Sequence, residues 1–164
     1  MGILMRNGLM PTLVLSLLVA LLLSQRHNGF MLVSVLLFLI PWFAYSCYRC
    51  IRFPAERRLR VQKSLVWGMA VLVIVSAHLV MFHSAQSYAQ KVSEKIEAYI
   101  SQHGHCPTGL EDLGISQTEF KEHLGLASYS CKDQQPSFFY ASTYALFDTE
   151  DYDFRKHEWV HRYD

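Results

Sequence analysis

Acidic residues are almost absent from the first half of the sequence. Residues 1–83 contain one acid, Glu56, and eight Lys or Arg residues, whereas residues 84–164 contain thirteen acids and seven Lys or Arg residues. The net charge of +1 therefore hides a charge of +7 on the first half and −6 on the second. Nucleic-acid binding is disfavoured, because the only basic cluster lies between apolar runs and the rest of the chain is acidic.

Three apolar runs predict three transmembrane α-helices, over about residues 8–24, 30–48 and 65–83. The first run is short for a hydrocarbon core of about 30 Å. A cleaved signal peptide is the alternative interpretation of this run, but no small-x-small cleavage site follows Leu23. We therefore expect a retained anchor and a membrane region over residues 1–83.

A basic connection over residues 49–64 separates the second and third runs. Loops rich in Lys and Arg stay on the cytoplasmic side of a membrane, so this connection determines the topology. Its six basic residues are Arg49, Arg52, Arg57, Arg58, Arg60 and Lys63. The sequence therefore predicts a multi-pass protein of the bacterial inner membrane, with a cytoplasmic amino terminus and a periplasmic domain over residues 84–164.

The periplasmic domain is predicted to begin with a long amphipathic helix that ends at Gly104. Its apolar face is formed by Tyr88, Val92, Ile96, Tyr99 and Ile100. Two capping boxes follow, Thr108 with Glu111 and Ser116 with Glu119, and each predicts a short helical turn. The second turn is expected to stop at Gly125.

Alternating patterns after Leu126 predict a short antiparallel sheet. We expect strands over residues 127–131 and 137–146, with a turn at 132–136. Two further short strands are expected over 152–154 and 158–163. The fold class is therefore three transmembrane helices plus a small α+β domain, in which the amphipathic helix packs on the sheet.

This order of a membrane-rooted helix, loops and a small sheet is similar to that of the globular domain of pilins and pseudopilins. The resemblance covers roughly the last half of the chain, and three spans in place of one depart from the family pattern. It implies a pilin-like domain and a role as an accessory subunit of a type IV pilus or secretion-type membrane assembly.

The four cysteines divide between the two predicted compartments. Cys106 and Cys131 lie in the periplasmic domain, where an oxidising environment favours a disulfide bond between them. Closing a loop of about 25 residues stabilises a folded domain by about 3 kcal/mol. Cys47 and Cys50 lie at the cytoplasmic end of a span, and we expect two interfacial thiols there.

Histidine is the residue type that best suggests a metal or catalytic site, but its positions are loosely spaced. His103 and His105 are candidate metal ligands beside Cys106, yet we expect no metal because the disulfide uses that cysteine. His78, inside the third run, is expected to pair with a neighbouring helix or to reach the membrane interface.

Motifs for common catalytic sites are also absent. The chain contains no Gly-x-Ser-x-Gly elbow, no His-Glu-x-x-His and no phosphate-binding loop. We therefore expect a protein that is not an enzyme and that has no cofactor. A periplasmic hydrolase that uses His157, Glu158 or His161 is the alternative that this expectation disfavours.

The last segment combines acidic and aromatic residues, which indicates a protein-binding surface. The predicted partner-contact residues are Asp148, Glu150, Asp151, Tyr152, Asp153 and Trp159. We expect the partner to be another protein, and the chain to be an immunity or inhibitor protein that captures a basic toxin at the membrane. The assembly subunit described above is the alternative, and its partner would be another membrane subunit.

Overall fold

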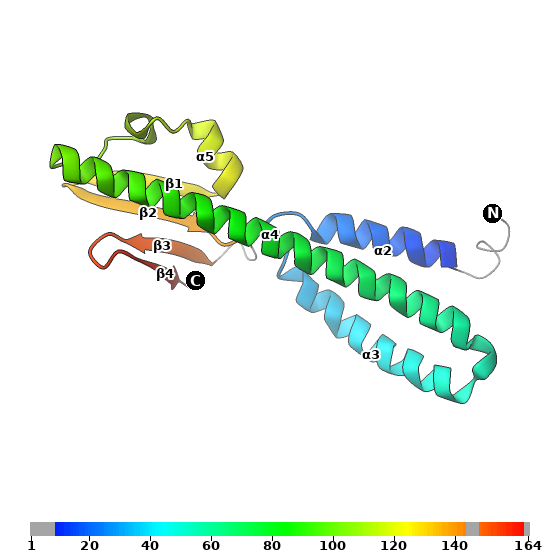
Figure 1. Ribbon diagram of the computed structural model, residues 1–164. Coiled ribbons are helices and arrows are strands. Elements are labelled where there is room, and N and C mark those ends of the chain that lie inside the picture. Colours follow the sequence, from blue (N-terminus) through cyan, green and yellow to red (C-terminus); the bar gives the residue numbers. More distant parts are fainter. Residues whose placement is uncertain (1–8, 144–147, 163–164) are drawn as a thin grey trace. The chain divides into compact units, whose positions relative to one another are not determined.

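A computed structural model describes residues 9–143 and 148–162 of the chain (Figure 1). The chain divides into two compact units, Met1–Leu79 and Val80–Asp164, which we call the helical unit and the sheet unit. The described helices are α2 (Leu9–Leu23), α3 (Met31–Arg52), η1 (Pro54–Glu56), α4 (Arg57–His103), η2 (Leu110–Leu113) and α5 (Gln117–Leu124). The strands are β1 (Ala127–Lys132), β2 (Gln135–Ala141), β3 (Thr149–Asp153) and β4 (Glu158–Arg162).

The boundary between the two units lies within α4, four residues before the predicted domain boundary at residue 83. Two of the described helices, α3 and α4, are long and apolar enough to cross a membrane. The described part of α2 is also apolar, but it has only 15 residues. The second and third predicted spans are thus present as candidate membrane helices, whereas the first predicted span, over residues 8–24, is not confirmed.

Apolar side chains cover the outside of the helical unit. Leu17 of α2 is 61% exposed and Leu37 of α3 is 67% exposed, whereas the polar residues Ser46 and His78 are buried. Water-soluble proteins rarely expose such continuous apolar surface. This distribution supports association of the helical unit with a membrane.

Contacts among α2, α3 and the first part of α4 form a small core in the helical unit. Leu23, Leu32 and Ile74 contribute one buried residue from each helix. His78 Nε2 lies 2.8 Å from the carbonyl oxygen of Leu23 at the end of α2. The expected pairing of His78 with a neighbouring helix is therefore confirmed.

The predicted basic loop over residues 49–64 is mostly helical, which corrects the expectation of a loop. Helix α3 continues to Arg52 and α4 begins at Arg57, so only residues 53–56 lie between the two α-helices. Pro54, at the start of η1, has no backbone N–H and interrupts the helix here. The Arg and Lys residues on either side favour helix, and they extend both neighbouring helices.

The sheet unit is organised on the second part of α4, as the sequence predicts. Small and β-branched residues on one face of α4 are almost completely buried: Ala85, Ala89, Val92 and Ile96. Gly104 has a φ of +74°, and its N–H donates to Ile100 O at 2.9 Å, which ends the helix at the expected residue.

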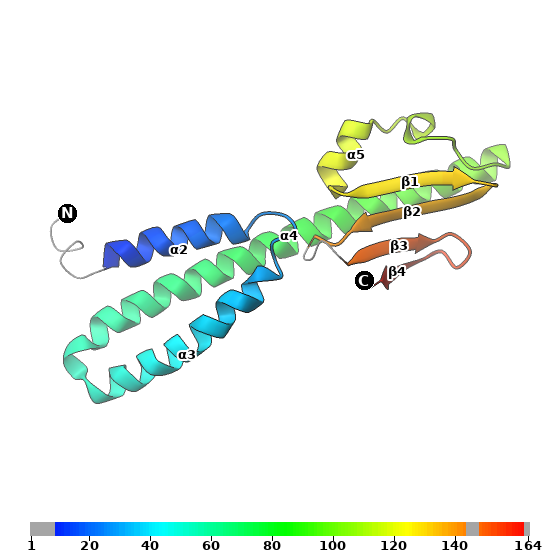
Figure 2. The ribbon, with the colours of Figure 1, turned by 180° about the vertical axis from the view of Figure 1, so that it is seen from behind.

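The four strands form one antiparallel sheet in the order β1-β2-β3-β4. Figure 1 and the reverse view in Figure 2 show the strands along the second part of α4, with α5 next to β1. A two-residue turn joins β1 to β2, because Asp133 and Gln134 both have positive φ values. This turn is shorter than the predicted turn over residues 132–136.

Strand β2 ends earlier and β3 begins earlier than the sequence predicts. The predicted strand over residues 137–146 stops at Ala141, and the N–H of Ser142 donates to Asp148 O at 2.7 Å just beyond the end of the strand. The part of that prediction over residues 144–146 lies outside the described residues. Strand β3 starts at Thr149 rather than Tyr152.

One of the two predicted capping boxes is wrong. Ser116 Oγ accepts the N–H of Glu119 at 3.1 Å, which confirms this cap of α5. Thr108, however, pairs with Asp112 rather than Glu111, because η2 begins only at Leu110. Asp112 Oδ2 accepts both the hydroxyl and the N–H of Thr108 at 2.8 Å, and the hydroxyl hydrogen bond lowers the pKa of Asp112.

Candidate partner-binding surface

A disulfide bond joins Cys106, which follows α4, to Cys131 on β1, as the sequence predicts. The two Cα atoms lie 6.1 Å apart, and the bond closes a loop with a sequence separation of 25 residues. It anchors the segment that leaves α4 to an edge strand of the sheet. The two predicted interfacial cysteines, Cys47 and Cys50, are free thiols.

The two candidate metal ligands lie at the end of α4 and just beyond it. The ring of His103 stacks on Tyr99 with centroids 4.1 Å apart, and the rings of His103 and His105 are 6.0 Å apart. Among residues 9–143 and 148–162, no group of three His, Cys, Asp or Glu side chains is arranged to hold a metal ion. His103 Nδ1 also lies 3.0 Å from Tyr99 O, so both contacts of the ring are with Tyr99 on the same helix.

The two predicted aromatic contact residues lie on the sheet face that packs against α4. Tyr152 is buried, and its hydroxyl donates to Glu97 Oε1 of α4 at 2.8 Å. Trp159 is half-buried and donates from Nε1 to Gln90 Oε1 of α4 at 3.0 Å. Burial, and then the bond to Glu97, raise the pKa of Tyr152 to about 12. Both residues thus join β3 and β4 to α4.

The predicted acidic residues divide between the two sheet faces. Glu150 shares the inner face with Tyr152, and its Oε1 lies 2.6 Å from His161 Nδ1 on β4. Asp148, just before β3, lies 3.9 Å from His161 Nε2. The histidine thus brings these two carboxylates together at one end of the strands.

The other two acids are also bound within the unit. Asp151 Oδ2 lies 2.7 Å from Arg162 Nε on β4. Asp153 Oδ1 accepts the backbone N–H of Arg155 at 2.9 Å and that of Lys156 at 3.4 Å, and the Arg155 hydrogen bond lowers the pKa of Asp153. Because these carboxylates have local partners, the acidic run is less available to a partner than its composition suggests. Its role in binding stays a prediction.

The three residues of the hydrolase alternative each have a separate partner. His157 Nδ1 lies 2.6 Å from Glu97 Oε1, and Glu158 pairs with Lys156 at 3.6 Å. His161 pairs with Glu150, as described above. These contacts stabilise the strands and the turn between them.

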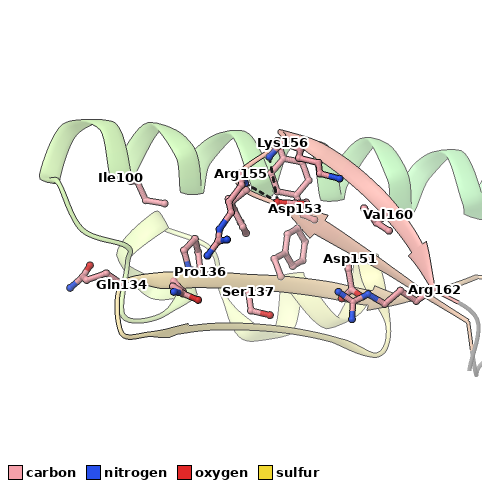
Figure 3. Close-up of a pocket in the computed structure, with 14 residues that line it drawn as sticks. Ile100, Gln134, Pro136, Ser137, Asp151, Asp153, Arg155, Lys156, Val160 and Arg162 are labelled. Carbon is pink, nitrogen blue, oxygen red and sulfur yellow. Dashed lines mark hydrogen bonds and ion pairs between the residues drawn. The ribbon is translucent and has the colours of Figure 1, made fainter.

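A cleft lies where β2 and β3 separate. The two strands are paired only over Phe138–Ala141 and Thr149–Tyr152, so the first part of β2 has no partner in β3. The cleft has a volume of about 710 Å³ and lies between the start of β2 and the turn that joins β3 to β4 (Figure 3). Its lining includes the apolar side chains of Ile100, Phe138 and Phe154.

Charged side chains of both signs surround this cleft. In Figure 3 the Arg155 side chain points toward Pro136, whereas Arg162 lies beside Asp151. No ion pair among the described residues includes Arg155. The cleft therefore presents an apolar floor and a cationic group on one rim, which sequence composition alone did not indicate.

An exposed row crosses the sheet face opposite α4. Phe139, Asp151 and Val160 are register partners on β2, β3 and β4, so their side chains lie next to one another on one face. Phe139 is 37% exposed and Val160 is 36% exposed. Phe139 and Val160 are not among the partner-contact residues that the sequence predicts. The alternation of buried Phe138 with exposed Phe139 is the signal that predicts this row once the strand is known.

The six residues that are predicted to determine topology differ in their surroundings. Glu56 Oε1 lies 2.6 Å from Arg49 and Glu56 Oε2 lies 2.9 Å from Arg60, so the single acid of this region holds two of the cations. The exposed members are Arg52, Arg57 and Arg58, whereas Lys63 is half-buried. Their role in topology stays a prediction.

No protein-family model, curated protein or solved structure matches this chain. The likeness to pilins and pseudopilins therefore stays a resemblance in the order of elements. The structure does contain that order, with a long helix, two short helical segments and a four-stranded antiparallel sheet in sequence.

Proposed function

We propose that this chain is a multi-pass protein of the bacterial inner membrane whose periplasmic sheet unit binds another protein. Its role is that of an immunity or inhibitor protein that captures a toxin. The observation that carries the proposal is the cleft between β2 and β3 together with the exposed row Phe139, Asp151 and Val160. Exposed apolar side chains beside a concave site are the usual anchors of protein interfaces.

The membrane arrangement in this proposal has three spans. Helix α2 is the first, because Leu17, Leu18 and Leu21 are exposed on it and Leu23 packs against α3 and α4. The exposed cations near residues 53–56 keep this connection in the cytoplasm. Three crossings then bring the sheet unit into the periplasm, where its disulfide bond is stable.

Charge and shape contribute differently to capture of a partner. Residues 84–164 have a net charge of −6, and a field of this sign attracts a basic protein over a distance. Because the acids of β3 are bound locally, the close contacts come from Phe139 and Val160 of the row and from the cleft. A basic toxin with an apolar protrusion fits this combination.

A second candidate function is that of an accessory subunit of a pilus or secretion assembly. It is favoured by the pilin-like order of elements and by the exposed apolar surface of the spans. In this case the essential contacts lie in the membrane, along side chains such as Phe38, which is 78% exposed.

Photo-crosslinking separates the two candidates. Benzoylphenylalanine replaces Phe139 in the exposed row or Phe38 in the span, and Lys121 on α5 is the control position in the sheet unit. Crosslinks are made in native membranes, and the products are identified by mass spectrometry. The inhibitor proposal predicts a crosslink to a soluble basic protein from position 139 and none from positions 38 or 121.

Other results lead to different conclusions. Crosslinks to integral membrane proteins from position 38, with none from position 139, would support the assembly subunit and remove the inhibitor proposal. Equal crosslinking from positions 139 and 121 would show that the exposed row is not a selective binding surface.

A further inference from the structure

A second site of interest is a groove in the helical unit that is lined by all three of its helices. The groove has a volume of about 450 Å³. Leu15 of α2 and Val35 and Phe38 of α3 contribute apolar walls. Trp42 of α3 and Trp67 of α4 lie nearer one end, together with Lys63 of α4. An apolar groove that ends in a single ammonium group has the chemistry of a lipid site.

The position of Lys63 along α4 matches the boundary of a hydrocarbon layer. From Lys63 to Phe82 the helix rises through nineteen residues, or about 29 Å at about 1.5 Å per residue. A bilayer core is about 30 Å thick, so Lys63 lies at the level of the headgroups on the side of residues 53–56. Trp67 lies one turn farther in, where interfacial aromatic residues occur.

Lys63 is the one basic residue in the lining of this groove, and it has no carboxylate partner among the described residues. The only acid in residues 1–83 is Glu56, and it binds Arg49 and Arg60. Among the ion pairs of the described residues, none includes Lys63. A half-buried ammonium group at a lipid boundary is stabilised by an anion that reaches it from the bilayer.

A second groove in the same unit lacks this feature. It has a volume of about 530 Å³ and lies between α2 and α4, where its lining includes Leu13, Ala20 and Val73. None of its lining residues is charged. This groove can accept an acyl chain, but nothing in its lining selects a headgroup, so the charge at Lys63 distinguishes the first groove.

We propose that the groove at Lys63 binds one anionic phospholipid from the inner leaflet. The acyl chain lies between α2 and α3 along Leu15 and Phe38, and the phosphate contacts the Lys63 ammonium group. This inference rests on the membrane placement proposed above, but not on the identity of the protein partner. It gives the helical unit a ligand in addition to its role as an anchor.

Native mass spectrometry of the full-length protein in mild detergent tests this site. The probes are dioleoyl phosphatidylglycerol, which is anionic, and dioleoyl phosphatidylcholine, which has no net charge. Lys63→Gln removes the groove cation, and Arg58→Gln removes an exposed cation of the same region as the matched control. Leu15→Trp fills the groove without changing the charge.

The wild-type protein and Arg58→Gln should each retain one phosphatidylglycerol in preference to phosphatidylcholine. Lys63→Gln should weaken phosphatidylglycerol binding about fivefold, the typical contribution of one lysine near a lipid surface. Leu15→Trp should weaken binding of both lipids at this site. Lys63→Arg should restore the preference for phosphatidylglycerol.

Several outcomes would overturn the proposal. Equal binding of phosphatidylglycerol to Lys63→Gln and to the wild-type protein would exclude Lys63 as the headgroup contact. Equal binding of the two lipids to the wild-type protein would exclude charge selection. Extraction of the wild-type protein from membranes by alkaline carbonate would remove the membrane placement itself, which distinguishes failure of that proposal from failure of the lipid site alone.

Discussion

The sheet unit has its apolar side chains in its interior, whereas the helical unit has many of them on its exterior. In the sheet unit the apolar residues are inside, and Ala89, Ile96 and Phe120 are fully buried. In the helical unit leucines such as Leu17 face outward, and a histidine and a serine, His78 and Ser46, are buried. The two parts are therefore adapted to different solvents.

The difference also separates the forces that hold each unit together. Burial of apolar surface from water is the main source of stability in the sheet unit. Helices surrounded by lipid gain little from that effect, and they associate through packing and interhelical hydrogen bonds. The contacts from His78 to Leu23 and from Ser46 to Ser64, at 2.8 and 3.3 Å, are of this kind.

The largest difference in stability between the two units is expected when one large apolar side chain in each unit is truncated to alanine. Phe120→Ala removes a ring that packs on Phe138 with centroids 5.8 Å apart, and it should destabilise the sheet unit by about 3 to 5 kcal/mol. Leu17→Ala, on the outward face of α2, should change stability by less than about 0.5 kcal/mol.

Denaturant unfolding in micelles measures the first effect through the fluorescence of Trp159, in a protein whose Trp42 and Trp67 are replaced by Phe. The fluorescence of Trp42 and Trp67 in a Trp159→Phe protein measures the effect of Leu17→Ala on the helical unit. Equal destabilisation by Phe120→Ala and Leu17→Ala, each in its own unit, would contradict the assignment of Leu17 to a lipid-facing surface. A loss well below about 2 kcal/mol for Phe120→Ala would show that its site collapses around the cavity.

Substitution of a cysteine in each unit should give a difference in stability of intermediate size. Cys131→Ser breaks the disulfide bond to Cys106 and should destabilise the sheet unit by about 3 kcal/mol through the entropy of the unfolded chain. Cys47→Ser, at a free thiol in the helical unit, should have little effect. The same Trp159 measurement, with and without dithiothreitol, checks Cys131→Ser. The fluorescence of Trp42 and Trp67 in a Trp159→Phe protein checks Cys47→Ser. A reductant effect that persists in Cys131→Ser would mean that another bond carries it.

Local signals predicted much of the sheet unit. A glycine in the left-handed region ends α4 at Gly104, and a serine followed three residues later by Glu caps α5. These features depend on a few adjacent residues, so the sequence alone is sufficient to find them. The pairing of Cys106 with Cys131 followed from the assigned compartment and the number of cysteines in it.

The functional surfaces depend on contacts between distant residues, and the sequence does not contain this information in a local form. The pairing of Asp151 with Arg162 depends on the register of β3 and β4, so the acidic run looked more available than it is. The groove at Lys63 likewise needs Leu15 and Phe38 from two other helices.

The smallest expected difference between the two units is in the stability that each loses at low pH. The pKa of Asp153 is lowered in the folded state because its carboxylate accepts the N–H of Arg155. A lowered folded-state pKa adds stability above the unfolded pKa of about 3.9, and this stability is lost as the pH falls through the folded value. The sheet unit should therefore lose stability as the pH falls below the unfolded pKa of this carboxylate.

Asp153→Asn tests this contribution, because the amide oxygen still accepts the N–H groups but carries no charge. The variant should be slightly less stable than the wild-type protein at pH 7 and should lose less stability on acidification, as followed by Trp159 fluorescence. The helical unit has only one acid, Glu56, so the fluorescence of Trp42 and Trp67 in a Trp159→Phe protein should change less over the same range. A parallel loss in both units would mean that acid acts on a property they share, such as the micelle, rather than on the carboxylates of the sheet unit.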